Sequence, residues 1–255
     1  MADDLSRTPP VKVRRALRHE VGFGCPVKDC GIPYLEYHHF DPPWEQEHHH
    51  DPARMIALCA THHAKAAAWT VEQLRVLKLA SPTHVVQGRF EWMREDVLAV
   101  VGGNLYYETP RILEVNARPV IWFERDEHNN LLLSLHMLTT SGEPRTRLVA
   151  NDWIIKGGPI EVESPPGGTL LKVRYANGDF ISVRFRNWSS ENALVKIYPR
   201  ASELSTELRF PLITAEVEMD VANSPIRLSA SETHVGGLVM TGGVFAHNCV
   251  GLSLS

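Results

Sequence analysis

The amino-terminal third takes its fold from residues 25–63, CPVKDCGIPYLEYHHFDPPWEQEHHHDPARMIALCATHH. It holds two short-spaced pairs of metal-binding residue types, Cys25 with Cys30 and Cys59 with His62. Two such pairs can close a tetrahedral zinc site with four protein ligands. A structural zinc ion matters most in a small domain, because the core of such a domain is thin.

The histidines outside these pairs are the second unusual feature. Residues 11–80 contain eight of the thirteen histidines and three of the four cysteines of the 255-residue chain. The predicted four-ligand zinc site does not need His38, His39 or His63. The Cys/His spacing alone fits a purely structural zinc knuckle equally well, so these surplus histidines are what favours a catalytic module.

The order of these motifs resembles the HNH endonucleases of the ββα-metal class. A cysteine pair is followed by a His-His pair at the end of a short predicted strand, then by the run from Met55 to Lys65 with its Cys-x-x-His-His pattern, and then by a helix at Thr70 to Lys78. The resemblance covers residues 12–80, about a quarter of the chain. It implies a zinc-stapled ββα-metal module that hydrolyses phosphodiester bonds in nucleic acid, with DNA favoured over RNA. The staple would be a structural Zn2+ on Cys25, Cys30, Cys59 and His62.

The resemblance also implies roles for single residues. His39 would be the general base, while His38 and His63 would bind the catalytic metal ion, and His63 would count among the catalytic residues. An all-imidazole pair accepts Mn2+, Ni2+ or Co2+ more readily than a pair with a carboxylate would, and Mg2+ is favoured by its abundance. Arg54 stands where the family commonly has its middle Asn. We therefore expect Asp51, or a backbone carbonyl, to orient the base.

A local basic surface is expected beside this site. The candidates to contact phosphates are Lys12, Arg14, Arg15, Arg18, Arg54 and Lys65, of which the first four lie in a segment that could be helical. The alternative for so short a run is a solvated helix face. The formal net charge of −4 argues against binding through bulk positive charge, although it allows a local basic face. The neighbouring loop His48-His49-His50 is expected to be solvated, with the alternative that one of these histidines stands beside the metal.

The segment from Ala64 to Leu79 is rich in Ala, Leu and Lys, which predicts helix. A break near Trp69 divides it into two predicted helices. Thr70 followed by Glu72-Gln73 indicates the start of the second helix, and Ser81-Pro82 should end the helical region.

From about Val85 the sequence changes to short apolar runs separated by turn signals, which predicts about ten to twelve strands. The runs Thr169 to Tyr175 and Phe180 to Phe185 read as a hairpin, because Asn177-Gly178 between them suits a tight turn. The fold class expected is therefore α+β, with the small module followed by a mostly-β domain. That domain could be a sandwich, a barrel or a short β-helix.

The expected domain plan has four parts: a flexible leader at 1–10, the HNH module at 11–82, a linker or helical connection at 83–97, and a β-rich domain at 98–255 for targeting or oligomerisation. The last twenty residues are apolar and small, as in a buried terminal strand or a homo-oligomer interface. Cys249 is expected to be a buried small hydrophobic residue.

Location and function follow from the remaining features. No apolar run approaches the roughly 18 to 20 residues that cross a bilayer, and the start of the chain lacks a secretory signal, so we expect a cytoplasmic protein with no membrane partner. The function expected is a metal-dependent endonuclease, by family association in phage defence or mobile elements. The alternative is a non-catalytic zinc-binding adaptor for nucleic acid or protein, with a degenerate HNH site.

Overall fold

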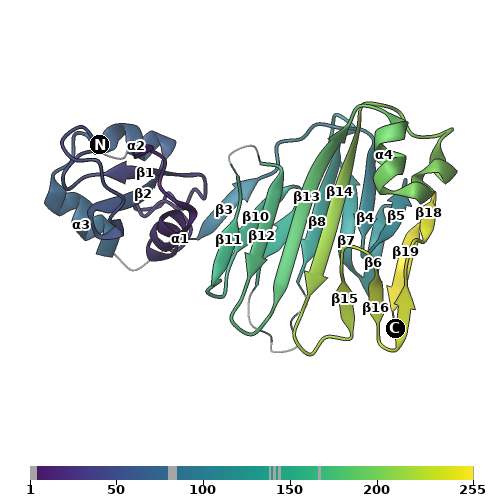
Figure 1. The fold of residues 1–255 in the computed structure, drawn as a ribbon. Coiled ribbons are helices and arrows are strands. Elements are labelled where there is room, and N and C mark those ends of the chain that lie inside the picture. The colour runs from purple at the N-terminus through teal and green to yellow at the C-terminus, as the bar shows by residue number, and fades with distance from the viewer. Residues whose placement is uncertain are drawn as a thin grey trace. The chain divides into compact units, whose positions relative to one another are not determined.

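The computed structural model describes residues 5–79, 85–137, 139, 142, 145–165 and 168–254 (Figure 1). The chain divides into two compact units, Met1–Gly88 and Arg89–Ser255. The boundary falls inside the connection expected at 83–97. The helical form of that connection is wrong, because β3 (Val86–Arg89) is a strand at the edge of a sheet, next to β10. Among the described residues, no helix has the length and apolar character needed to cross a bilayer.

The amino-terminal unit contains a strand pair and three α-helices. Its elements are α1 (Val11–Glu20), β1 (Leu35–His39), the short 3-10 helix η1 (Pro52–Arg54), β2 (Met55–Cys59), α2 (Ala60–Ala66) and α3 (Val71–Leu79). β1 and β2 are antiparallel, with Leu35 opposite Cys59 and His39 opposite Met55. Because α2 follows β2 without a linker, the order is strand, strand, helix.

The core of this unit forms around β2, whose five residues are all buried. Leu17 of α1, Leu35 of β1, Ala66 of α2 and Leu74 of α3 pack in the same cluster. Each helix contributes a single fully buried apolar position, so the apolar core is small.

The predicted break between two helices is confirmed, since residues 67–70 separate α2 from α3. The expected start of α3 is a reciprocal cap: the backbone N–H of Gln73 donates to Thr70 Oγ1 at 3.2 Å, and the backbone N–H of Thr70 donates to Gln73 Oε1 at 2.9 Å. These bonds satisfy donors that the first helical turn leaves without partners. The expected stop at Ser81-Pro82 lies outside the described residues.

The carboxy-terminal unit is built from two sheets. The seven-stranded sheet has the order β19 (Val250–Leu254), β6 (Arg111–Val115), β7 (Arg118–Arg125), β8 (Leu131–His136), β9 (Arg147–Val149), β10 (Asp152–Ile155) and β3. The ten-stranded sheet has the order β11 (Glu161–Glu163), β12 (Leu170–Arg174), β13 (Phe180–Trp188), β14 (Leu212–Asp220), β15 (Ile226–Leu228), β16 (Thr233–Val235) and β17 (Leu238–Met240), with β4 (Val97–Val101), β5 (Asn104–Tyr107) and β18 (Val244–Ala246) attached beside β14. α4 (Glu191–Ile197) and the 3-10 helix η2 (Pro199–Leu204) connect β13 to β14.

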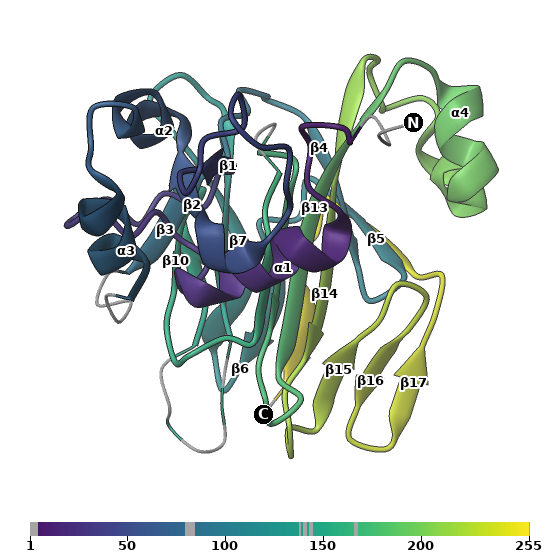
Figure 2. The same cartoon turned by 60° about the vertical axis from the view of Figure 1, so that its left-hand side comes forward.

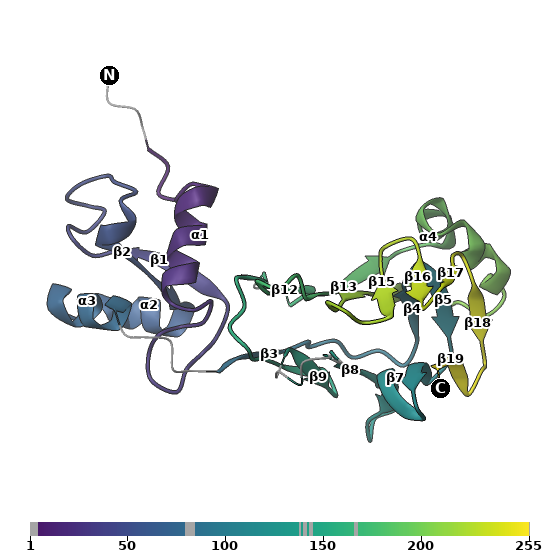
Figure 3. The same ribbon diagram turned by 90° about the horizontal axis from the view of Figure 1, so that it is seen from below.

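The two sheets lie face to face as a sandwich, which Figure 3 shows most clearly. Aromatic side chains join them: the ring of Phe185 on β13 lies 4.7 Å from that of Phe90, beside β3, and Phe90 lies 6.5 Å from Trp153 of β10. Figure 2 shows the ribbon of β15, β16 and β17 that extends the second sheet. The mixed α+β, strand-rich fold expected from the sequence is confirmed.

The predicted hairpin is confirmed, because β12 and β13 pair antiparallel with Leu170 opposite Arg184. The number of strands after Val85 was underestimated: β3 to β19 make seventeen among the described residues. Many of these strands have only three residues, too few for an alternating pattern to stand out. Cys249 is exposed in the turn before β19 rather than buried.

Candidate active site and metal centre

Cys25, Cys30, Cys59 and His62 form a cluster whose donor atoms all lie within 4.8 Å of one another. His62 Nδ1 lies 3.3 Å from Cys25 Sγ and 3.2 Å from Cys59 Sγ, and the Sγ atoms of Cys30 and Cys59 are 3.8 Å apart. A tetrahedral zinc ion would set sulfur–sulfur edges of about 3.8 Å and sulfur–nitrogen edges of about 3.5 Å, given its usual bond lengths. The predicted ligand set is therefore brought together in a geometry that fits a metal such as zinc.

Two pieces of local structure present these ligands. The loop after α1 folds back on itself, as the backbone N–H of Cys25 donates to the carbonyl of Ile32 at 2.9 Å and that of Cys30 donates to Val27 at 3.0 Å. The other pair comes from the junction of β2 and α2, where Cys59 ends the strand and His62 lies in the first helical turn. A metal ion bound by these four residues would connect the loop after α1 to the end of β2.

Without a bound cation, burial favours the uncharged forms of the ligands in this cluster. Burial raises the pKa of Cys25 to about 12 and raises the pKa of Cys30, while burial and the nearby Lys65 lower the pKa of His62. Deprotonated thiolates are the form that binds zinc, and the charge of the ion offsets their lost hydration.

Next to this cluster, His38, His39 and His63 line a single cleft of about 680 Å3. The first two end β1, and His63 lies on α2, which follows the partner strand directly. The rings of His38 and His63 meet edge to face with centroids 5.2 Å apart. Burial, and then the neighbouring His63, lower the pKa of His38, which keeps its imidazole neutral.

His39 occupies the inner wall of this cleft and is only 5% exposed. Burial, followed by repulsion from His49, lowers its pKa to about 4, and a backbone hydrogen bond with His49 opposes part of that shift. Its Nε2 atom is buried and has no hydrogen-bond partner among the described residues. At neutral pH the ring is therefore an uncharged acceptor.

The loop that follows β1 covers His39, which the sequence did not predict. His49 is 6% exposed, so the expectation of a solvated histidine loop is wrong at this position. Its Nε2 lies 3.1 Å from the carbonyl oxygen of Pro42, and its Nδ1 accepts the backbone N–H of Asp51 at 3.3 Å. The ring of Trp44 stacks on His48 at 4.4 Å and lies 4.8 Å from His39.

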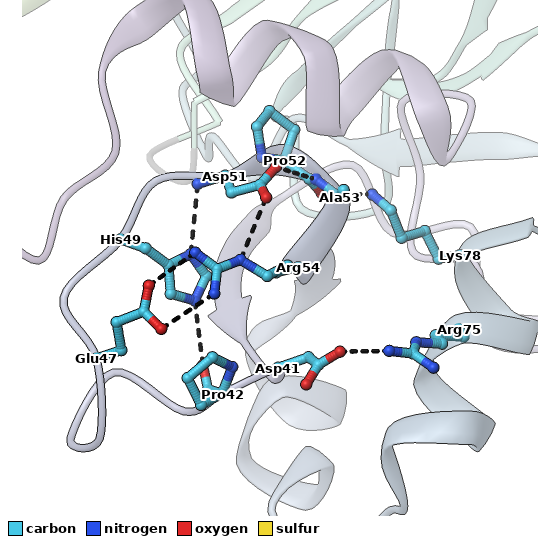
Figure 4. Close-up of polar contacts among 10 residues, drawn as sticks. All are labelled: Asp41, Pro42, Glu47, His49, Asp51, Pro52, Ala53, Arg54, Arg75 and Lys78. Carbon is cyan, nitrogen blue, oxygen red and sulfur yellow. Dashed lines mark hydrogen bonds and ion pairs between the residues drawn. The ribbon is translucent and has the colours of Figure 1, made fainter.

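Asp51 is engaged with Ala53 and Arg54, as Figure 4 shows. Its carboxylate accepts the backbone N–H of Ala53 at 2.9 Å and the Nε–H of Arg54 at 3.2 Å, which caps η1. Direct orientation of His39 by this carboxylate is therefore not what the structure shows, and the backbone of His49 takes that place. Arg54 also donates to both carboxylate oxygens of Glu47, at 2.8 and 3.1 Å, so its charge is already paired.

The predicted phosphate-contacting residues lie outside the cleft lining in the described part of the chain. Lys12, Arg15 and Lys65 are exposed, whereas Arg14 and Arg18 are half-buried on α1. The basic residue that does line the cleft is Arg7, which was not predicted and which pairs with Glu45 at 3.4 Å. A lone arginine before a predicted helix carries no sequence signal for this role.

Comparisons with protein-family models, with curated proteins and with solved structures find no match for this chain. The geometry described above is therefore the basis for assigning a function.

Proposed function

We propose that the amino-terminal unit is a metal-dependent endonuclease module of the HNH type, which hydrolyses phosphodiester bonds in nucleic acid and acts on DNA. One observation carries the proposal: His38, His39 and His63 line one cleft on a strand–strand–helix unit that a Cys/His metal cluster ties together. The sequence pattern that resembles HNH enzymes and this convergence of imidazoles support the same chemistry.

His39 is the general base in this proposal. Its uncharged ring can take a proton from a water molecule that attacks the phosphorus atom. The backbone hydrogen bond with His49 fixes the orientation of the ring, as the second shell of a site commonly does. His49 is held in turn by Pro42 and by the backbone of Asp51.

His38 and His63 would hold the catalytic cation. Their ring contact brings two nitrogen donors to one side of the cleft, and a pair of imidazoles suits Mn2+, Ni2+ or Co2+ better than Mg2+. A divalent cation bound there supplies Lewis acidity for the scissile phosphate and the departing oxygen. The two side chains leave the remaining coordination positions to water and phosphate oxygens.

A second function, a non-catalytic zinc-binding adaptor, is favoured by a different observation. His39 is almost wholly buried, with the ring of Trp44 close to it, so the base has little contact with solvent. An adaptor would bind nucleic acid or protein without cutting. The β-rich unit would then serve targeting or oligomerisation under either function.

The metal requirement separates these functions. Zinc-loaded full-length protein should nick supercoiled plasmid faster in Mn2+ than in Mg2+ at matched concentration, and His63→Ala should abolish the difference. Equal or reversed rates in the two metals would contradict His38 and His63 as an all-imidazole ligand pair. Binding of the plasmid without any nicking would favour the adaptor.

A further inference from the structure

Glu36 lies beside the proposed catalytic ligands and has no part in the zinc cluster or the base. Its Oε2 atom is 3.0 Å from Nδ1 of His63, a hydrogen-bond distance between β1 and α2. Glu36 and His38 are two residues apart on the same strand, so their side chains emerge on the same face. His63 therefore contacts both a carboxylate and a second imidazole.

The contact determines which nitrogen of His63 can bind a cation. An ionised carboxylate can only accept a hydrogen bond, so the atom of His63 that faces it, Nδ1, is favoured to carry the proton. The proton on Nδ1 leaves the lone pair on Nε2. Metal-binding histidines are commonly held in this way by a carboxylate on the other ring nitrogen, which orients the ring and makes it a stronger ligand.

We propose that Glu36 is a positioning residue that holds His63 in the Nδ1-protonated form, with Nε2 free to bind the cation. The inference rests on the proposed function, because it concerns the ligand pair of that site. Glu36 acts through His63 and does not itself touch the phosphate or the cation.

The same contact contributes little to folding. The side chain of Glu36 is 54% exposed and that of His63 is 28% exposed, and even an ion pair between such exposed side chains adds little to stability. Replacing Glu36 should therefore leave the fold and the zinc content intact, which separates a positioning role from a structural one.

Two measurements on the zinc-loaded full-length protein test the inference. The first is the tautomer of His63 at pH 8, read from 15N chemical shifts of its ring without added metal. The second is calorimetric titration with Ni2+, in which the component that His63→Ala removes defines the site. The variants are Glu36→Ala, Glu36→Gln, which keeps an acceptor oxygen but no charge, and Glu72→Ala as a matched control, since Glu72 is exposed on α3.

Glu36→Ala should shift His63 away from the Nδ1-protonated form and weaken Ni2+ binding about 10-fold to 100-fold. Glu36→Gln should lose less affinity, and Glu72→Ala should match the wild type. Wild-type Ni2+ affinity in Glu36→Ala, at a site that needs His63, would overturn the inference and leave the proposed function standing. Absence of any Ni2+ site that needs His63 would overturn both.

Discussion

Asp179 is the most deeply buried carboxylate with a charged partner in the described part of the carboxy-terminal unit. It accepts the Nε–H of Arg145 at 2.7 Å and the backbone N–H of Ala222 at 2.9 Å, and the side chains of the pair are 2% and 5% exposed. Asp179→Asn leaves the guanidinium buried without its counter-charge. We expect the free energy of unfolding, measured by urea denaturation, to fall by about 3–5 kcal/mol. An unchanged midpoint would contradict this account of the pair.

The pH dependence of the same residue has a defined sign. Burial by itself would raise the pKa of Asp179, but hydrogen bonds from Arg145 and Asn177 hold that pKa below its ordinary value. The ionised carboxylate therefore stabilises the fold above about pH 4, the ordinary range of Asp, and this contribution is lost as the pH falls through the lower folded-state pKa. The stability gap between wild type and Asp179→Asn should narrow between urea titrations at pH 7 and pH 3. If the difference in unfolding free energy between wild type and Asp179→Asn were the same at pH 7 and pH 3, the ionisation of Asp179 would not contribute to stability in this way.

At the residue scale, the sequence predicted the metal cluster and the three cleft histidines, because ligand spacing is a local property of the chain. It did not predict the partner of His63, since an exposed glutamate such as Glu36 has many possible neighbours. The burial of His49 could not be predicted from the sequence either, because it depends on the path of the loop between β1 and η1. Of the two groups expected to orient His39, the Asp51 carboxylate contacts Ala53 and Arg54, and the backbone hydrogen bond with His49 agrees with the other.

At the scale of elements, the cluster of Cys25, Cys30, Cys59 and His62, which could bind a metal such as zinc, joins the loop after α1 to the junction of β2 and α2. Cys59 ends β2 and stands immediately before α2, so its loss affects both elements. Cys59→Ser should lose the zinc and, with it, the order of residues 20–65, because metal binding energy is folding energy in such modules. Zinc content and amide hydrogen exchange measure the two effects. Retention of one equivalent of zinc would refute this ligand assignment.

Loss of the amino-terminal cap of α3 should destabilise the protein less than loss of Cys59. Thr70→Ala removes the oxygen that accepts the N–H of Gln73 and should destabilise the start of α3 by about 1 kcal/mol. Hydrogen exchange of the first turn of α3 measures this change, and Thr70→Ser, which keeps the oxygen, is the control. Equal hydrogen exchange in Thr70→Ala and Thr70→Ser would show that the hydroxyl oxygen of residue 70 does not stabilise the first turn of α3.

Elements were predictable where turn chemistry or helix caps mark them. The hairpin of β12 and β13 has Asn177-Gly178 at its turn, and α3 has Thr70 at its start. The three-residue strands β15 to β18 were not predictable one by one, because their pairing depends on contacts with distant strands such as β14 and β5.

At the scale of the whole molecule, the chain has two compact units and the metal cluster lies in the smaller one. Removal of zinc with a chelator should therefore lower the stability of that unit and leave the β-sandwich unchanged. We expect two transitions in differential scanning calorimetry, of which only one shifts with the chelator. A common shift of both would show that the units unfold together.

The fold class and the order of the two parts were predictable from composition and periodicity. The sandwich was one of three expected architectures, because local patterns do not determine how strands of two sheets face each other. The strand β3 lies in the segment 83–97, which was expected to be a linker or helical connection, and its pairing at the edge of a sheet depends on the distant strand β10.

In the proposed nuclease, His39 takes a proton from water beside a cation held by His38 and His63. The most direct measurement is the initial rate of plasmid nicking in Mn2+ by the zinc-loaded protein and its variants. His39→Ala should lower the rate about 10²-fold to 10⁴-fold, as expected for loss of a general base, while His128→Ala, at an exposed histidine, should not change it. Nicking by His39→Ala at the wild-type rate would contradict the account.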